Sequence, residues 1–171
     1  MWNRGVVRVR WWMMVCVSCG LLVGCGDLKL QTLSGQELSW QAQRGQWVFI
    51  NYWAEWCKPC RKEIPELNQF ALQHAEQVEI LGVNFDEPDT QELQRQTQAM
   101  QIQFPQLVTD PSVALGFSRP SVLPATYVFD PQGVYRGVMV GPQTEASLGA
   151  WLKEGEALVP ARGEKTAGIR P

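Results

Sequence analysis

Two cysteines separated by two residues, Cys57 and Cys60, are the side chains in this sequence best suited to chemistry. The apolar run 47–53 before them predicts a buried strand, and a helix-like pattern follows. A thiol at such a junction lies among backbone N–H groups without partners, and the helix dipole favours its thiolate. We therefore expect Cys57 to titrate roughly one unit or more below the usual value of about 8.5 and to act as a nucleophile. Cys60, on the same side of the helix, can then attack a mixed disulfide at Cys57.

Two prolines, one between the cysteines and one after them, stand at informative positions. Pro59 suits the first turn of a helix, where a missing N–H costs nothing. Pro65 falls inside the expected helix and should kink it. Together with Trp56 and the two cysteines, these positions match the W-C-x-x-C pattern of the thioredoxin superfamily, which the chain resembles. The longer pattern W-C-x-P-C-R-x-E-x-P-x-L, residues 56–67, resembles the membrane-anchored TlpA/ResA-like branch.

The resemblance implies an α/β thioredoxin-like fold over residues 28–158, with a central mixed β-sheet flanked by helices and an N-terminal β-hairpin extension. It also implies a cis-proline facing the dithiol. Pro124, directly before the apolar strand 126–129, matches that proline, and Pro120 is the rival. The backbone at Leu123 would then pair with a bound partner peptide, and Trp56, Leu123 and Pro124 would form the docking surface. The alternative for Pro124 is an ordinary trans proline that opens an edge strand.

Proton transfer needs a titratable group near the second cysteine. Many thioredoxins carry a buried aspartate at the place of Asn51, six residues before Cys57, and an amide cannot titrate. Glu63, one turn beyond Cys60, is therefore the candidate acid or base. The alternative is that Glu63 is a solvated helix carboxylate.

Residues 1–24 are predicted to be a signal peptide. Three arginines precede an apolar stretch at 11–23, whose 13 residues fall short of the ~20 that a membrane-spanning helix needs. The stretch ends in Leu-Val-Gly-Cys, which resembles the bacterial lipobox and makes Cys25 the candidate lipidation site. The chain would then be lipid-anchored on the periplasmic side of a bacterial cell envelope. An ordinary signal peptide and an uncleaved anchor are the alternatives.

The other cysteines and the charge limit what else the chain can do. Cys16 and Cys19 lie within the predicted leader and should be removed with it. Without the leader's three arginines the chain has 12 basic and 17 acidic residues, a net charge of −5 that argues against a nucleic-acid partner. A zinc site would have only His74 and Cys25 to add to the pair. A purely structural disulfide would close too short a loop to stabilise much.

The remaining elements follow from hydrophobic pattern and turn residues. A hairpin is expected at 28–40, a second core strand at 78–85, and a helix at 90–103 that opens with an Asp89–Glu92 capping box. A short strand at 104–109 and a helical turn at 110–117 come next. After the strand at 126–129, a turn at 130–133 leads to a strand at 134–140, and an amphipathic helix at 144–158 ends the fold. One domain, 25–158, is expected, with a disordered tail at 159–171.

The sequence thus predicts a membrane-tethered thiol–disulfide oxidoreductase that needs no metal or organic cofactor. The resemblance implies reduction of periplasmic client proteins, such as apocytochrome c or a copper-site assembly protein, and a membrane electron donor that recycles the dithiol. Two other classes stay open. A peroxiredoxin-like peroxide reductase shares the fold, but would have a Thr and a Pro ahead of its cysteine. A non-enzymatic copper-binding lipoprotein would have added His or Met residues near the pair.

Overall fold

The central strand of the sheet is β3 (Trp47–Trp53), all seven residues of which are buried in this computed structural model, which describes residues 26–158. β3 pairs in parallel with β4 (Val78–Asn84) and antiparallel with β6 (Ala125–Phe129). The edges are β5 (Gln106–Leu107) and β7 (Tyr135–Val140), in the order β5-β4-β3-β6-β7. The expected central mixed sheet is confirmed, and a strand buried on both faces accounts for the continuous apolar run.

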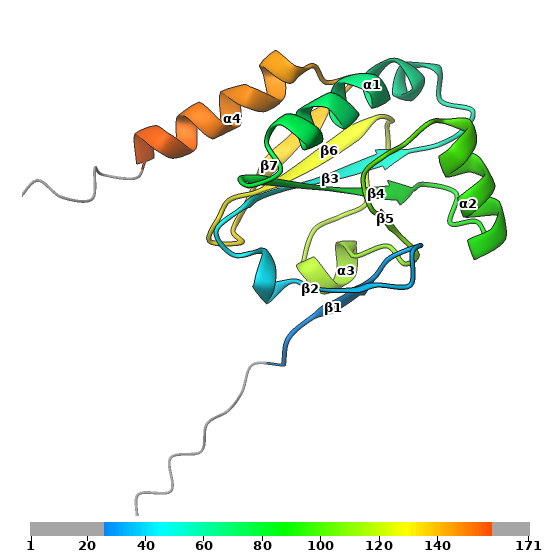
Figure 1. Ribbon diagram of the computed structural model, residues 1–171, viewed down its shortest axis with the longest axis horizontal. Helices are drawn as coiled ribbons and strands as arrows, with labels where there is room; N and C mark the ends of the chain where they lie inside the picture. Colours follow the sequence, from blue (N-terminus) through cyan, green and yellow to red (C-terminus); the bar gives the residue numbers. More distant parts are fainter. Residues whose placement is uncertain (1–25, 159–171) are drawn as a thin grey trace, which may run out of the picture.

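Helices cover one face of this sheet (Figure 1). α1 (Lys58–Gln73) and α4 (Glu145–Leu158) lie on that face, and Phe49 of β3 points into the core that they share. Phe70 of α1 meets the Phe49 ring edge-on at 6.0 Å between centroids. Successive strand residues point to opposite faces, so the neighbours of Phe49 in β3 belong to a second core.

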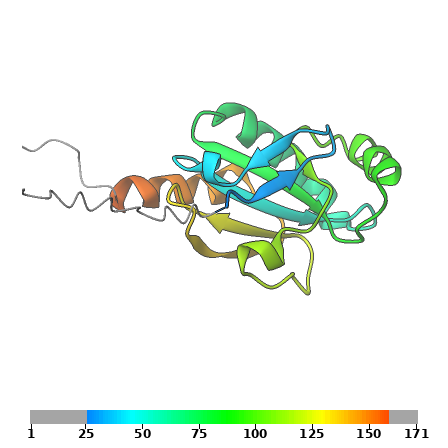
Figure 2. The same cartoon turned by 90° about the horizontal axis from the view of Figure 1, so that it is seen from below.

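The N-terminal hairpin and α3 (Ser112–Leu115) lie on the other face of the sheet, as Figures 1 and 2 show. They cover the second core. The hairpin, β1 (Lys29–Gln31) with β2 (Glu37–Ser39), pairs antiparallel, as predicted. Trp40, just after it, packs edge-on against Phe129 at 5.0 Å. A polar connector follows as the short helix η1 (Gln41–Gln43), and the chain then enters β3.

The helix α2 (Thr90–Ala99) is shorter than the predicted 90–103. It ends because Gln101 adopts a left-handed backbone conformation, with a φ of 56°, that no helix can continue through. The predicted capping box is only half formed. Asp89 accepts a hydrogen bond from the Glu92 N–H, but the Glu92 carboxylate binds Arg95 instead of turning back to the helix start. A charged guanidinium is a stronger partner for a carboxylate than a backbone amide is.

The predicted leader, Cys25 and the tail at 159–171 lie outside the described residues. Between residues 26 and 158, the structure contains no helix with the length and apolar character needed to cross a bilayer. The two short elements β5 and α3 occupy only part of the expected ranges 104–109 and 110–117.

Candidate active site

Cys57 and Cys60 form a disulfide at the start of α1, with their Cα atoms 5.3 Å apart. Cys57 is the N-cap residue, and its sulfur accepts a hydrogen bond from the Cys60 N–H at 3.2 Å. Cys57 is 3% exposed and Cys60 is fully buried, so Cys57 is the more accessible residue of the pair. Pro59 lies in the first turn, where no N–H is required.

The local electrostatics favour a Cys57 thiolate in the reduced protein. The N-terminus of the 16-residue helix α1 points its unpaired N–H groups and its positive dipole end at this residue. The Cys60 N–H, which already bonds the Cys57 sulfur in the disulfide form, is a ready donor to that thiolate. These contacts lower the energy of the attacking species.

The peptide bond between Leu123 and Pro124 is cis, so the cis-proline of this chain is Pro124 and not Pro120. Leu123 is partly buried and packs against the apolar cluster that contains both cysteines. Pro124 is buried and leads directly into β6. The predicted cis-proline segment and the cysteine pair thus meet at one apolar cluster, although 63 positions separate Cys60 from Leu123.

Glu63 points into the protein, and the alternative of a solvated carboxylate is wrong, because the residue is only 1% exposed. Its Oε1 accepts a hydrogen bond from Asn51 Nδ2 at 2.8 Å, and its Oε2 accepts one from the Gln143 N–H at 2.9 Å. Burial raises the pKa of Glu63 to about 7, against the lowering effect of these two donors. A carboxyl group with such a pKa can take up or release a proton near neutral pH.

The fully buried Asn51 side chain links Glu63 to the sheet. Its Nδ2 also bonds Thr126 Oγ1 at 3.0 Å, while its Oδ1 has no partner among the described residues. Neither Thr126 nor Gln143 was predicted to contribute to the site, because they lie 75 and 80 residues from their partners. No local pattern marks a backbone N–H that bonds a carboxylate from another element.

Trp56 is 63% exposed and stands next to Cys57 on the surface. Its indole N–H donates to Asp86 Oδ2 at 2.8 Å, so the ring is held from one edge and presents the rest to solvent. Of the predicted site residues, Trp56 directly precedes Cys57 in the chain, Leu123 packs against the cluster that holds both cysteines, and Glu63 lies one turn after Cys60 in α1. Cys25 is outside the described residues, and among residues 26–158 no group of three acidic, His or Cys side chains is arranged to hold a metal.

The fold and the paired cysteines define a thiol–disulfide oxidoreductase with a thioredoxin-like fold. Residues 25–138 match the model of the AhpC/TSA family, and the chain belongs to that family. The chain is 33% identical over 124 residues to the thioredoxin-like protein YneN of Bacillus subtilis (strain 168), covering 71% of this chain and 72% of YneN. It is 30% identical over 123 residues to the thiol-disulfide oxidoreductase ResA of Geobacillus thermodenitrificans (strain NG80-2), covering 71% and 70%.

Solved structures show the same fold. A thiol:disulfide interchange protein of the thioredoxin family from Chlorobium tepidum TLS superposes with a TM-score of 0.61 at 25% identity. The match covers 75% of this chain and 92% of that protein. The expected thioredoxin-like fold and the TlpA/ResA-like resemblance are thereby confirmed.

Proposed function

We propose that this protein is a membrane-tethered, periplasmic thiol–disulfide oxidoreductase that reduces disulfides in client proteins. The observation that carries the proposal is the Cys57–Cys60 disulfide at the N-terminus of α1, within an apolar cluster against which Leu123 of the cis-proline segment also packs. The similarity to the thiol-disulfide oxidoreductase ResA supports the exchange chemistry. Reduction of clients in cytochrome c maturation or copper-site assembly is the proposed setting.

The reaction follows from the positions of the two sulfurs. In the reduced protein the Cys57 thiolate attacks one sulfur of a client disulfide, and the other client sulfur leaves as a thiolate. Cys60, three residues away and buried behind Cys57, then attacks the Cys57 sulfur of the mixed disulfide. This second step closes the disulfide and releases the reduced client. A dithiol donor, proposed to be membrane-bound, returns two electrons to the pair.

Glu63 is proposed to move the proton of Cys60. The thiol of Cys60 must lose its proton before it attacks, and a buried group cannot pass that proton directly to water. Glu63 follows Cys60 by one turn of α1, and its raised pKa, about 7, suits a base that works near neutral pH.

Trp56, Leu123 and Pro124 are proposed to contact the client. The exposed indole of Trp56 supplies apolar area next to Cys57. The backbone of Leu123 is proposed to pair with an extended peptide of the client. Cys25 is proposed to carry the lipid anchor after removal of residues 1–24, which would keep the domain at the membrane where its electron donor lies.

Disulfide reduction and client capture test the proposal. The purified Cys57→Ser variant should reduce insulin no faster than the uncatalysed reaction, since no attacking thiolate remains. The Cys60→Ala variant in the native host should accumulate a mixed disulfide between Cys57 and its client, which mass spectrometry identifies. Wild-type rates of insulin reduction by Cys57→Ser would refute the proposed chemistry.

Peroxide reduction is the second candidate, since the matching model is that of the AhpC/TSA family. A peroxidatic Cys57 would be oxidised by hydrogen peroxide to a sulfenic acid without help from Cys60. The Cys60→Ser variant separates the two functions. Rapid oxidation of its single thiol by micromolar peroxide would favour a peroxidase, and oxidation no faster than that of an ordinary thiol favours the oxidoreductase.

A further inference from the structure

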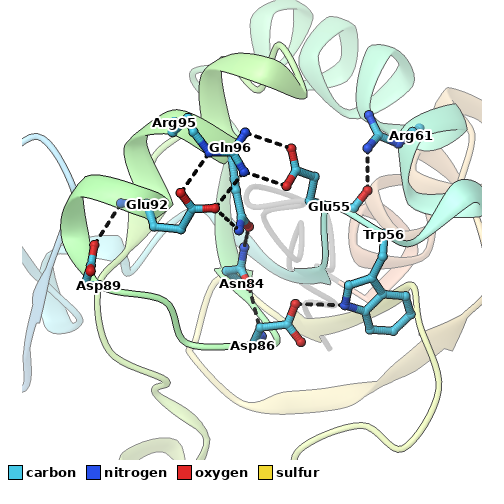
Figure 3. Close-up of polar contacts among 9 residues, drawn as sticks. All are labelled: Glu55, Trp56, Arg61, Asn84, Asp86, Asp89, Glu92, Arg95 and Gln96. Carbon is cyan, nitrogen blue, oxygen red and sulfur yellow. Dashed lines mark hydrogen bonds and ion pairs between the residues drawn. The ribbon is translucent and has the colours of Figure 1, made fainter.

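A closed circuit of hydrogen bonds connects the two residues before Cys57 to the helix α2 and to the end of β4 (Figure 3). We call it the α2 circuit. Its members are Glu55, Trp56, Asn84, Asp86, Glu92, Arg95 and Gln96.

Arg95 forms the first half of the α2 circuit. Its guanidinium bonds both carboxylate oxygens of Glu55, from Nη1 at 3.2 Å and from Nη2 at 2.7 Å. The same group bonds both oxygens of Glu92, from Nε at 2.8 Å and from Nη2 at 2.6 Å. Two bidentate contacts fix the position of a planar group better than a single ion pair does.

Two amides and an aspartate form the second half. Gln96 donates to Glu92 Oε1 at 2.8 Å, and Asn84 donates to Gln96 Oε1 at 2.7 Å. Asn84 Oδ1 accepts from the Asp86 N–H at 2.9 Å. Asp86 in turn accepts the indole N–H of Trp56 at 2.8 Å. The peptide bond between Glu55 and Trp56 closes the circuit.

The charge on Glu92 determines how the side-chain amides of Gln96 and Asn84 are oriented. An ionised Glu92 can only accept, so the NH2 group of Gln96 must face it and the Gln96 oxygen must face Asn84. The Asn84 oxygen is then left to accept from the Asp86 N–H. Glu92 is held ionised, because its hydrogen bonds with Arg95 and Gln96 lower its pKa to about 2. All donors from Trp56 to Glu92 therefore point the same way along the series, an arrangement in which hydrogen bonds strengthen one another.

The two amides of the α2 circuit are buried, which restricts their motion, whereas Trp56 and Arg95 lie at the surface. Asn84 is 3% exposed and Gln96 is 9% exposed, and an amide left unpaired at such depth would be costly. Trp56 and Arg95 are exposed. On the other side of Glu55, the Arg61 guanidinium donates to the Glu55 carbonyl oxygen. The segment before Cys57 is thereby held by α2 and α1 together, although α2 carries no part of the dithiol.

We propose that the α2 circuit prepares the surface around Cys57 for client proteins. Arg95, Gln96 and Asn84 hold Trp56 and the segment before Cys57 in the arrangement that a client contacts. This inference rests on the proposed reduction of protein disulfides. A client polypeptide that covers Cys57 must also contact the neighbouring indole. Holding that indole beforehand removes the entropic cost of ordering it on binding. A small disulfide reaches Cys57 without covering Trp56 and gains nothing from the circuit.

The test compares two substrates across two matched variants. Arg95→Gln removes both bidentate contacts at an exposed helix position, and Arg136→Gln makes the same change on β7, where the ion pair with Asp130 is long, at 3.8 Å. Steady-state kinetics are measured with insulin and with a small aromatic disulfide. For Arg95→Gln we expect kcat/KM for insulin to fall roughly three- to tenfold, mainly through KM, from the lost ordering of about one side chain. Turnover of the small disulfide should change less than twofold, and Arg136→Gln should match wild type on both substrates.

A second variant tests the series of amides. Gln96→Glu keeps the shape of the side chain but places a carboxylate against Glu92, so repulsion replaces the hydrogen bond. The same selective loss on insulin is expected, and the same redox potential as wild type. Equal losses on both substrates, or wild-type kinetics in both Arg95→Gln and Gln96→Glu, would overturn the inference. If the wild-type protein itself reduces no protein disulfide, the proposed function fails and not the positioning role alone.

Discussion

Glu63 shows how one buried carboxyl group can connect redox chemistry to pH. Burial favours its neutral form, whereas the donors Asn51 Nδ2 and the Gln143 N–H favour its charged form, and burial has the larger effect. The pKa therefore rises from 4.5 to about 7. Between these two pH values the folded protein keeps a proton that the unfolded chain has released. The contribution of Glu63 to the free energy of unfolding is therefore fully present below about pH 4.5 and is lost as the pH rises through 7.

Glu63→Gln should remove this pH dependence. A rise of the pKa from 4.5 to about 7 corresponds to roughly 3 kcal/mol, which wild type should lose relative to the variant between pH 4.5 and 7. The variant should fold, because Asn51 can turn its amide and offer its unpartnered Oδ1 to the new NH2 group. Urea unfolding of the two oxidised proteins at a series of pH values measures the difference. Parallel stability curves across this window would show that Glu63 titrates near its ordinary value.

At the scale of elements, one arginine fixes the position of the segment before the cis-proline. Arg119 donates to the Phe85 carbonyl oxygen at 2.7 Å and pairs with Asp110 at 2.7 Å and with Glu87 at 2.8 Å. Its guanidinium also lies over the Phe85 ring, 5.0 Å from the centroid. These contacts join the chain just before Pro120 to the loop after β4. That loop contains Asp86, which accepts the indole hydrogen bond of Trp56. Arg119 thereby holds together the segment before the cis-proline and the loop after β4.

Arg119→Gln should destabilise the protein by about 1–2 kcal/mol, more than an ordinary surface ion pair contributes. The reason is that Asp110 is largely buried, with a side chain only 9% exposed, and would lose the cation at its Oδ2. The free energy of unfolding in urea measures the loss. Arg136→Gln is the control, because its partner lies at 3.8 Å, and it should cost less than about 0.5 kcal/mol. Equal effects of the two substitutions would contradict this view of Arg119.

The same elements show what the sequence could and could not predict. β3 matched its predicted range in full, because a short continuous apolar run rich in aromatic and branched residues is typical of a buried strand. The cis-proline was found through a family pattern, since nothing in its immediate neighbours specifies a cis bond. The end of α2 was missed, because the left-handed conformation of Gln101 has no clear local signal. The contacts of Gln143 and Arg95 were missed for a different reason: they join side chains or amides that only the folded chain brings together.

At the scale of the whole molecule, very little chain separates the first strand of the hairpin from the proposed lipid anchor. β1 begins at Lys29, so only residues 26–28 separate it from Cys25. Three residues span at most about 10 Å when fully extended. If Cys25 carries the anchor, the domain is held against the bilayer surface, and clients and the electron donor must be met there.

Cys25→Ser tests this tether in the native host. The variant lacks the thiol that would be acylated, so we expect it in the soluble periplasmic fraction, whereas wild type is found with the membrane. Insulin reduction by the purified variant should equal that of wild type, because Cys25 has no part in the exchange. In the cell, however, the fraction of Cys57–Cys60 in the reduced state should fall, since a released domain meets a membrane-bound donor less often. Thiol alkylation of intact cells measures that fraction, and a variant that stays with the membrane and remains reduced would show that residues 1–25 anchor the chain in another way.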